Sequence, residues 1–463
     1  KQVRLFAIGL AFIAIWLLVK TITNVLIVEI LSIIGSFAIW EASNIWIVEK
    51  PSIRLKRHRL RRLMDTEIRF TVLKEAEATD LKVYFIVPSH VPFAPDLETS
   101  GGKFDPEIIR KALQRKDAVG LSECVGHYIL AEHPELLESF DDTLSLAGKT
   151  LQGHLPAIYG PNMAACAAAG VATCHESFCE QDVYERLRNG IHLQMREGSA
   201  ARNMQLGLLK AVMDSGVDTS NVSIVTDDLH TCDLKDRGHM DDSLRTAFGQ
   251  GLDFLKGIQM VTINCARAFK MEDKIGSLTP GRRADINITT GAEDFKVLTT
   301  VAGGKQVSEN GQLLVHYEKA EHDPCILNTV HFVNPITADS FKMKAPEGAK
   351  KVKVMCMDTL PYIPFTSRRD VELNVVDGVI QCDTEQDVLY IAQVERHGKN
   401  GNIGKAFMGG FHLKGGALAS SVGHDNHNII VMGDSFEDMS LAVNRCAELG
   451  GGQVIVRDGK VVA

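Results

Sequence analysis

The 463-residue sequence lacks the paired cysteines that mark small metal-binding and redox motifs, because its ten cysteines include no Cys-x-x-Cys spacing. Thiols scattered in this way fit neither a zinc ribbon nor the disulfide framework of a small secreted domain. We therefore expect reduced, mostly buried cysteines. An excess of positive charge is also absent: the formal net charge is −8, and the long C-terminal part has no basic stripe interleaved with aromatics. This argues against a nucleic-acid partner. The length allows two or three domains.

The beginning of the chain is its most apolar part. An uninterrupted apolar run covers residues 5–19, and a second run from about 25 to 48 is broken by two glutamates. A helix needs about 20 apolar residues to cross a hydrocarbon core. A basic cluster at 54–62 follows, and basic flanks face the cytoplasm. Residues 1–62 are therefore predicted to form a transmembrane helical hairpin in contact with membrane lipid. A signal peptide and a buried helical pair are the alternatives.

From residue 81 onward, short strand-like runs alternate with helical segments. The predicted strands lie at 81–87, 118–121, 150–154, 171–176, 191–196 and 222–225. The predicted helices lie at 105–115, 136–146, 162–169 and 181–189. This order is typical of a parallel sheet with crossover helices. After residue 281 the pattern changes to short strands, and a final region from about 336 mixes strands with a helix at 437–449.

Four polar residues lie at or just past the ends of predicted strands: Glu123, His154, His175 and Asp227. A (β/α)8 barrel places its active site at the carboxyl ends of its strands. Histidine nitrogens and carboxylate oxygens together suit divalent ions such as Zn²⁺, Mn²⁺ or Fe²⁺. The four residues therefore predict a metal site that activates water as hydroxide. Each residue alone has a structural alternative, such as a helix cap or a hydrogen-bonded histidine.

Several segments carry a distinctive order of glycine, histidine and acidic residues. They are VPSHVPFAPDLETSGG (87–102), VGLSE (119–123), GHLP (153–156), CHE (174–176), MREGSAARN (195–203), TDDLH (226–230), GHMD (238–241), GSLTPGRRADI (276–286) and ASSVGHDNHNIIVMG (419–433). Together they resemble the metal-dependent adenine deaminases of the amidohydrolase superfamily, from about residue 76 to the end. The resemblance implies an α/β fold: an incomplete TIM-like (β/α)8 amidohydrolase barrel at 76–280, partial β-sandwich strands at 281–330, and an α+β C-terminal domain at 331–463.

The resemblance also implies an activity. Members of this family use water to deaminate adenine hydrolytically to hypoxanthine and ammonia, in purine salvage, at a binuclear Mn²⁺ or Fe²⁺ centre. Carried over, Glu123 is a bridging ligand, His154 and His175 are metal ligands, and Asp227 is both a ligand and the general base. The catalytic region is expected in the cytoplasm.

Further roles follow from the same resemblance. Either Glu176 or Glu197 protonates a purine ring nitrogen as negative charge builds there. Arg196, Ser199 and Asp228 hold the substrate.

One family feature is missing, because no His-x-His pair occurs anywhere in the chain. The family has such a pair at the end of its first barrel strand, so only part of the binuclear site is expected here. The chain also looks truncated at both ends. The alternatives are a catalytically inactive, membrane-anchored purine-binding or structural protein, a homo-oligomer in which another chain supplies the missing strands, and turnover of another cyclic amide or amidine. His424, Asp425 and His427 either cap the site or form a structural cluster.

Overall fold

The computed structural model describes residues 76–92, 94, 99–199, 201–318, 321, 327–361, 365–424 and 427–463. All of them belong to one unit, Phe70–Ala463. Within these ranges, no helix is both long and apolar enough to cross a membrane. The transmembrane hairpin predicted at 1–62 lies outside the described residues.

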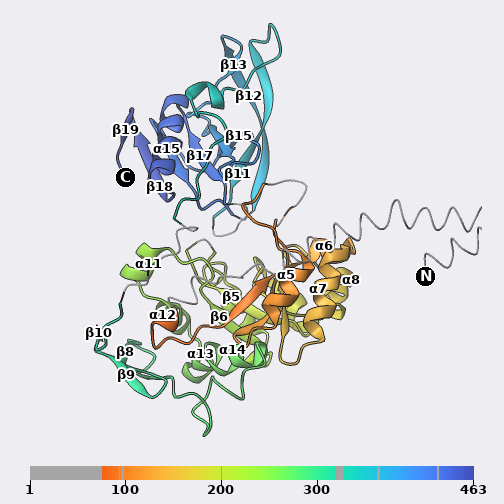
Figure 1. The fold of residues 1–463 in the computed structure, drawn as a ribbon, viewed down its shortest axis with the longest axis vertical. Coiled ribbons are helices and arrows are strands. Elements are labelled where there is room, and N and C mark those ends of the chain that lie inside the picture. The colour runs from red at the N-terminus through yellow and green to blue at the C-terminus, as the bar shows by residue number, and fades with distance from the viewer. Residues whose placement is uncertain are drawn as a thin grey trace, which may run out of the picture. The chain divides into compact units, whose positions relative to one another are not determined.

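A six-stranded parallel sheet forms the first part of the described fold (Figure 1). Its strands follow one another in chain order: β1 (Phe85–Pro88), β2 (Ala118–Val125), β3 (Thr150–His154), β4 (Val171–Cys174), β5 (His192–Arg196) and β6 (Val222–Val225). The connecting helices are α5 (Pro106–Leu113), α6 (Gly126–Leu130), α7 (Pro134–Leu144), α8 (Pro161–Ala168), α9 (Glu180–Arg188), α10 (Leu208–Asp214) and the short η2 (Thr219–Asn221). The predicted parallel α/β sheet is confirmed. In the described residues, β1 and β6 are its two edges and do not pair with each other.

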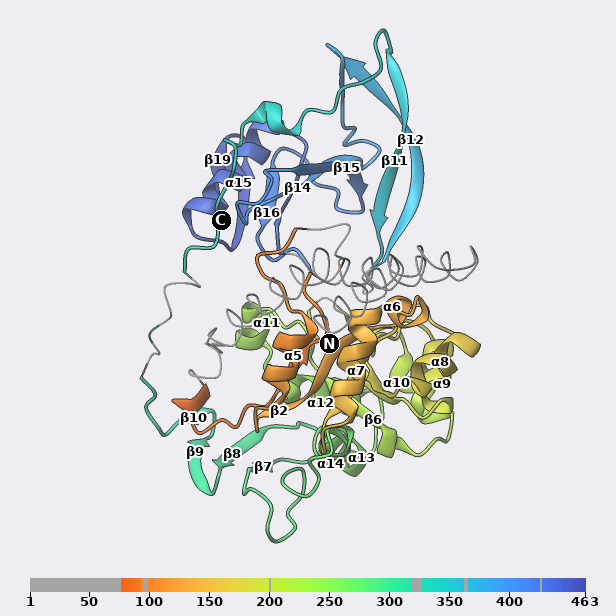
Figure 2. The same cartoon turned by 45° about the vertical axis from the view of Figure 1, so that its right-hand side comes forward.

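Signals in the sequence explain where the first helices begin. The Asp105 carboxylate accepts a hydrogen bond from the backbone N–H of Ile108 at 3.1 Å, and Pro106 occupies the first position of α5. Proline suits that position because its missing N–H would have no partner inside the helix. Pro134 starts α7 in the same way. α5 and α7 lie side by side in both views of the molecule (Figure 2).

Two strand boundaries differ from the prediction. β1 begins only at Phe85, where its pairing with Ala118 starts, and Leu81 is exposed. The strand predicted at 118–121 continues to Val125, so Glu123 lies inside β2 rather than past its end. The alternation of apolar residues that predicts strands does not show where a neighbouring strand stops pairing.

The two faces of the parallel sheet differ in polarity. On β5, Leu193 and Met195 belong to an apolar cluster that includes residues of α10, α12 (Met240–Gly249) and α13 (Phe254–Met260). Successive side chains on a strand point to opposite faces. His192 and Arg196 therefore point to the other face. The same period on β3 and β4 brings polar side chains to that face.

A hydrogen-bond network on that polar face links neighbouring strands. The Gln152 amide donates to the Thr150 hydroxyl at 2.6 Å, and the Thr173 hydroxyl donates to the Gln152 carbonyl oxygen at 2.5 Å. All three side chains are buried. Because His154 and His175 follow Gln152 and Thr173 by two residues, they emerge from the same face at the carboxyl ends of β3 and β4.

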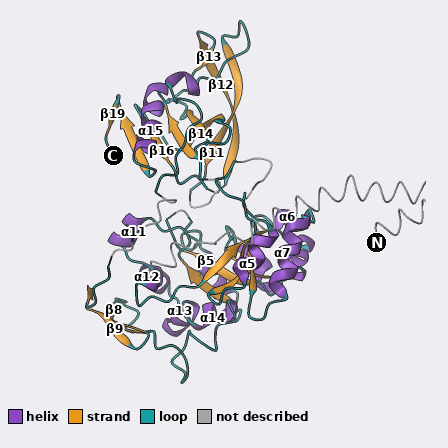
Figure 3. Ribbon diagram, in the orientation of Figure 1, coloured by secondary structure: helices purple, strands orange, loops and turns teal. Residues whose placement is uncertain are grey.

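Helices and then two further sheets complete the chain (Figure 3). Two further helices before the next sheet are α11 (Thr231–Asp236) and α14 (Ile263–Ala268). A four-stranded antiparallel sheet has the order β10-β9-β8-β7 and consists of β7 (Ile286–Thr289), β8 (Val297–Ala302), β9 (Lys305–Glu309) and β10 (Gln312–Leu313).

A nine-stranded sheet has the order β13-β12-β11-β15-β14-β17-β16-β18-β19 and is antiparallel except between β11 and β15. Its strands are β11 (Lys351–Thr359), β12 (Thr366–Val376), β13 (Val379–Ile380), β14 (Leu389–Val394), β15 (Ile403–Gly409), β16 (Ala417–Ser420), β17 (Ile429–Gly433), β18 (Gln453–Arg457) and β19 (Lys460–Val461). The short η4 (Ala338–Phe341) and α15 (Phe436–Glu448) share one apolar core with it. The nine cysteines within the described ranges are free thiols, as predicted.

Candidate active site

Glu123 occupies a strained position inside β2. Its φ angle is +50°, and the pairing of β2 with β3 shifts register between Leu121 and Cys124. A left-handed backbone at a non-glycine residue costs about 1–3 kcal/mol and persists only where the surroundings hold it. Ser89, just past β1, supplies one such contact, because its hydroxyl donates to the Glu123 carbonyl oxygen at 2.8 Å. The irregularity sets the direction of the Glu123 side chain.

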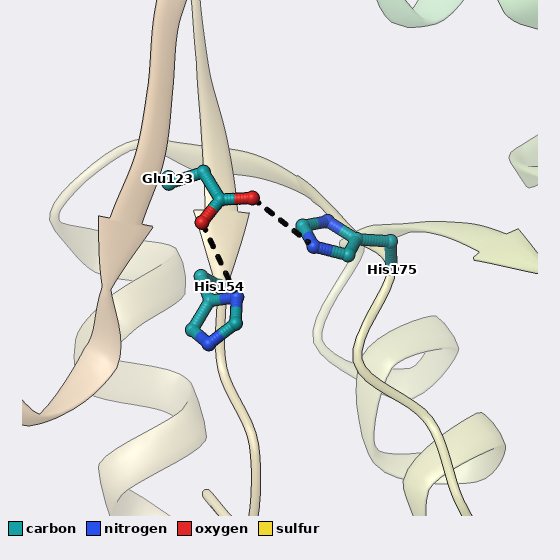
Figure 4. A group of neighbouring side chains, drawn as sticks. All are labelled: Glu123, His154 and His175. Atoms are coloured by element: carbon teal, nitrogen blue, oxygen red, sulfur yellow. Dashed lines mark ion pairs between the residues drawn. The ribbon is translucent and has the colours of Figure 1, made fainter. Parts of the chain in front are cut away.

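The Glu123 carboxylate faces both predicted histidine ligands (Figure 4). Glu123 Oε2 lies 3.7 Å from His154 Nδ1, and Glu123 Oε1 lies 3.5 Å from His175 Nε2. The potential ligand atoms of the three residues all lie within 4.8 Å of one another. Two ligands about 2.1 Å from an ion, at a tetrahedral angle, are about 3.4 Å apart. The three residues could therefore hold a single divalent ion, and their predicted roles as ligands of a binuclear centre stay predictions.

Glu176 joins this group from the loop after β4. Its Oε1 lies 3.4 Å from His154 Nδ1 and 3.3 Å from His175 Nε2, and the side chain is buried. Burial raises the pKa of Glu176, but the hydrogen bond with His175 and the charges of Arg196 and the two histidines outweigh it and lower the pKa to about 2. Burial lowers the pKa of His175, yet the bond and charge of Glu176 raise it above its ordinary value. The pair favours ionised Glu176 at neutral pH.

Arg196 connects the histidine group to Asp227. Its Nη2 lies 3.2 Å from Glu176 Oε2, and its Nη1 donates to Asp227 Oδ2 at 2.7 Å. The guanidinium also lies over the Phe178 ring, 5.7 Å from its centroid. Asp227, like Glu123, has a positive φ, of +55°. Arg196 thus links Glu176 to Asp227. Among the described residues, the group that could hold one ion consists of Glu123, His154 and His175, so the predicted role of Asp227 as a metal ligand stays a prediction.

Two other predicted residues, Glu197 and Ser199, have different surroundings. Glu197 Oε2 accepts a hydrogen bond from the Met204 backbone N–H at 3.1 Å, and burial raises the Glu197 pKa. The Ser199 hydroxyl donates to Asp233 Oδ2 at 2.5 Å and accepts from the backbone N–H of His230. These contacts order the loops after β5 and β6. The predicted catalytic and substrate-binding roles of Glu197 and Ser199 stay predictions.

Asp228 is paired with a histidine of the C-terminal region. His424 Nε2 lies 3.1 Å from Asp228 Oδ2, and both side chains are more than half exposed. The His424 and His427 rings lie 5.6 Å apart, whereas Asp425 lies outside the described residues. The predicted substrate-binding role of Asp228 is untested by this pairing.

Two residues that position site residues, Ser89 and Asn203, were not predicted from the sequence. Ser89 holds the backbone of Glu123. Asn203 is fully buried, donates to the Ser177 carbonyl oxygen at 2.8 Å and accepts from the Arg196 N–H at 2.8 Å. Ser89 directly follows the end of β1, which is a usable signal, whereas Asn203 lies seven residues past the end of β5. Their partners lie 34 and 26 residues away along the chain, so the sequence could not pair them.

Residues 69–307 match the amidohydrolase family. The chain belongs to the amidohydrolase family. Residues 364–463 match the adenine deaminase C-terminal domain, so the predicted resemblance is confirmed. The domain boundaries predicted at 280 and 330 stay predictions.

Three curated relatives give the scale of the similarity. Adenine deaminase of Clostridium botulinum is 36% identical, over 84% of this chain and 65% of that protein. Adenine deaminase 1 of Carboxydothermus hydrogenoformans is 38% identical over 84% and 65%, and adenine deaminase of Moorella thermoacetica is 37% identical over 85% and 66%. The amidohydrolase chain described here thus spans about two thirds of the length of these relatives.

Proposed function

We propose that this amidohydrolase deaminates adenine by hydrolysis, giving hypoxanthine and ammonia. The observation that carries the proposal is the convergence of Glu123, His154 and His175 at the carboxyl ends of neighbouring parallel strands. The adenine deaminase C-terminal domain and the relatives named adenine deaminase support adenine as the substrate. Water is the second substrate, and the six-amino group of the purine leaves as ammonia.

The metal in this proposal is Mn²⁺ or Fe²⁺, held by Glu123, His154 and His175. One carboxylate and two imidazoles form a donor set that such borderline ions accept. When bound, a divalent ion lowers the pKa of a coordinated water toward about 7 and so supplies hydroxide at neutral pH. The family centre is binuclear, and the three residues with Asp227 account for part of it.

The chain's own residues handle protons and charge. Asp227 accepts a proton from the attacking water, and its ion pair with Arg196 orients the carboxylate. Glu176 is ionised near neutral pH, which suits an electrostatic role beside the histidines better than proton donation. Glu197 is the better proton donor, because burial raises its pKa and so favours the protonated, neutral carboxyl group. Arg196, Ser199 and Asp228 are the proposed contacts for the purine.

Three broader expectations belong to the same proposal. The catalytic region acts in the cytoplasm, residues 1–62 contact membrane lipid, and homo-oligomers form. None of these carries the catalytic argument.

The test is ammonia release from adenine by the purified full chain loaded with Mn²⁺. We expect turnover by the wild type and none by His175→Ala, which removes one proposed ligand. Absence of both ammonia and retained metal after dialysis would contradict the proposal. Adenine binding in calorimetry without turnover would favour an inactive purine-binding protein. Turnover of 6-chloropurine or a dihydropyrimidine in preference to adenine would assign a different substrate.

A further inference from the structure

A fully buried ion pair lies behind the two histidines. Arg186 and Asp182 face each other on α9, with Arg186 Nη1 2.9 Å from Asp182 Oδ1. Their side chains are 0% and 2% exposed. A buried ion pair is often no more stabilising than a well-packed apolar pair, because removing both charges from water is costly. The other contacts of the pair therefore indicate its role.

Arg186 joins the two histidine-bearing segments through one nitrogen. Its Nη2 donates to the carbonyl oxygen of Leu155 at 2.6 Å and to that of Glu176 at 2.5 Å. Leu155 directly follows His154, and Glu176 directly follows His175. The guanidinium thus ties together the backbone immediately after each histidine.

Asp182 holds the far end of the same loop. Its Oδ2 accepts hydrogen bonds from the backbone N–H groups of Phe178 at 2.8 Å and Cys179 at 3.2 Å. The loop after His175 is therefore fixed at its beginning by Arg186 and at its end by Asp182. Both anchors come from one turn of one helix, so the position of the loop is tied to that of α9.

We propose that Arg186 and Asp182 are positioning residues that set the separation of His154 and His175 for metal binding. The proposal rests on the metal site of the proposed function. Productive ligand geometry tolerates only about 0.5 Å of displacement, and residues that orient ligands typically contribute 10–100-fold to metal affinity. A guanidinium bonded to two backbone carbonyls supplies that constraint without touching the metal or the substrate.

The test compares Arg186→Lys with Arg188→Lys in the full chain. Arg188 lies on the same helix but is exposed, so its variant is a matched control. Lysine keeps the positive charge beside Asp182 but has a single nitrogen in place of the two terminal guanidinium nitrogens that make these hydrogen bonds. We expect Mn²⁺ binding by Arg186→Lys, measured by calorimetry, to weaken at least tenfold, with wild-type affinity in Arg188→Lys. Unchanged Mn²⁺ affinity together with a lower Tm of the metal-free protein would overturn the proposal.

A second variant, Asp182→Asn, keeps the proposal testable if Arg186→Lys does not fold. Asp182→Asn keeps the size of the side chain and leaves Arg186 in place but removes the charge that orients it. We expect weaker Mn²⁺ binding here as well. If neither variant folds, the pair is structural and the proposal fails. Ammonia release from adenine is measured on the same samples. A wild type that binds Mn²⁺ but does not convert adenine refutes the proposed function. Variants that bind Mn²⁺ with the same affinity as the wild type refute the positioning role.

Discussion

Acid is expected to destabilise the parallel sheet through His192. This histidine lies on β5 with 5% of its surface exposed, and its Nε2 lies 3.0 Å from the Ser223 hydroxyl. Burial lowers its pKa from 6.5 to about 4, because a charged imidazole is poorly solvated there. The unfolded chain therefore binds the proton more tightly. The stability that neutral His192 contributes is complete above pH 6.5 and is lost as the pH falls from 6.5 to 4.

The size of the effect follows from the two pKa values. One pKa unit corresponds to about 1.4 kcal/mol. The full difference is therefore about 3 kcal/mol, and about 2 kcal/mol of it is lost between pH 7 and pH 5. The expected loss is a measurable fraction of the unfolding free energy of ordinary domains, which is about 5–15 kcal/mol.

Urea unfolding of the wild type and His192→Gln at pH 7 and pH 5 measures this loss. Circular dichroism is the appropriate signal, because all three tryptophans lie within residues 1–62. We expect the wild type to lose about 2 kcal/mol more than His192→Gln. His316→Gln is the control, since the His316 side chain is 83% exposed. Equal losses in the wild type and His192→Gln would refute the reasoning.

Two further perturbations follow from contacts in the sheet. Arg196→Met leaves the carboxylates of Glu176 and Asp227 without their shared cation. We therefore expect the free energy of unfolding to fall by about 3 kcal/mol and kcat/KM for adenine to fall at least tenfold. Wild-type turnover by this variant would contradict the prediction. A Cβ on Gly120 would lie 2.1 Å from the Thr150 carbonyl oxygen, so Gly120→Ala should cost about 1–3 kcal/mol in urea unfolding. Gly249→Ala meets nothing within 4 Å and is the control; equal midpoints in both variants would contradict the packing argument.

Local signals made part of this structure predictable. The sequence Asp105-Pro106 predicts the start of α5. The alternation of side chains along a strand places His154 and His175 on the same face of the sheet. Parallel strands bring their carboxyl ends to one edge of the sheet, so the histidine pair followed from order alone. The family motifs then supplied the chemistry.

Long-range contacts could not be read from the sequence. Glu123 reaches the histidines only because a register shift interrupts β2, and no residue pattern announces that shift. The sequence likewise contains no sign that the Arg196 guanidinium binds Glu176 and Asp227, which lie 20 and 31 residues away. Such pairings depend on which strands become neighbours, and propensity alone does not encode that.

The most direct test of the central claim is the amount of Mn²⁺ bound per chain after dialysis, in the wild type and in His154→Ala and His175→Ala. If Glu123, His154 and His175 form the metal site, the wild type retains Mn²⁺ and each variant loses it at unchanged expression. Full Mn²⁺ content in either variant would contradict the ligand assignment and with it the proposed origin of the hydroxide.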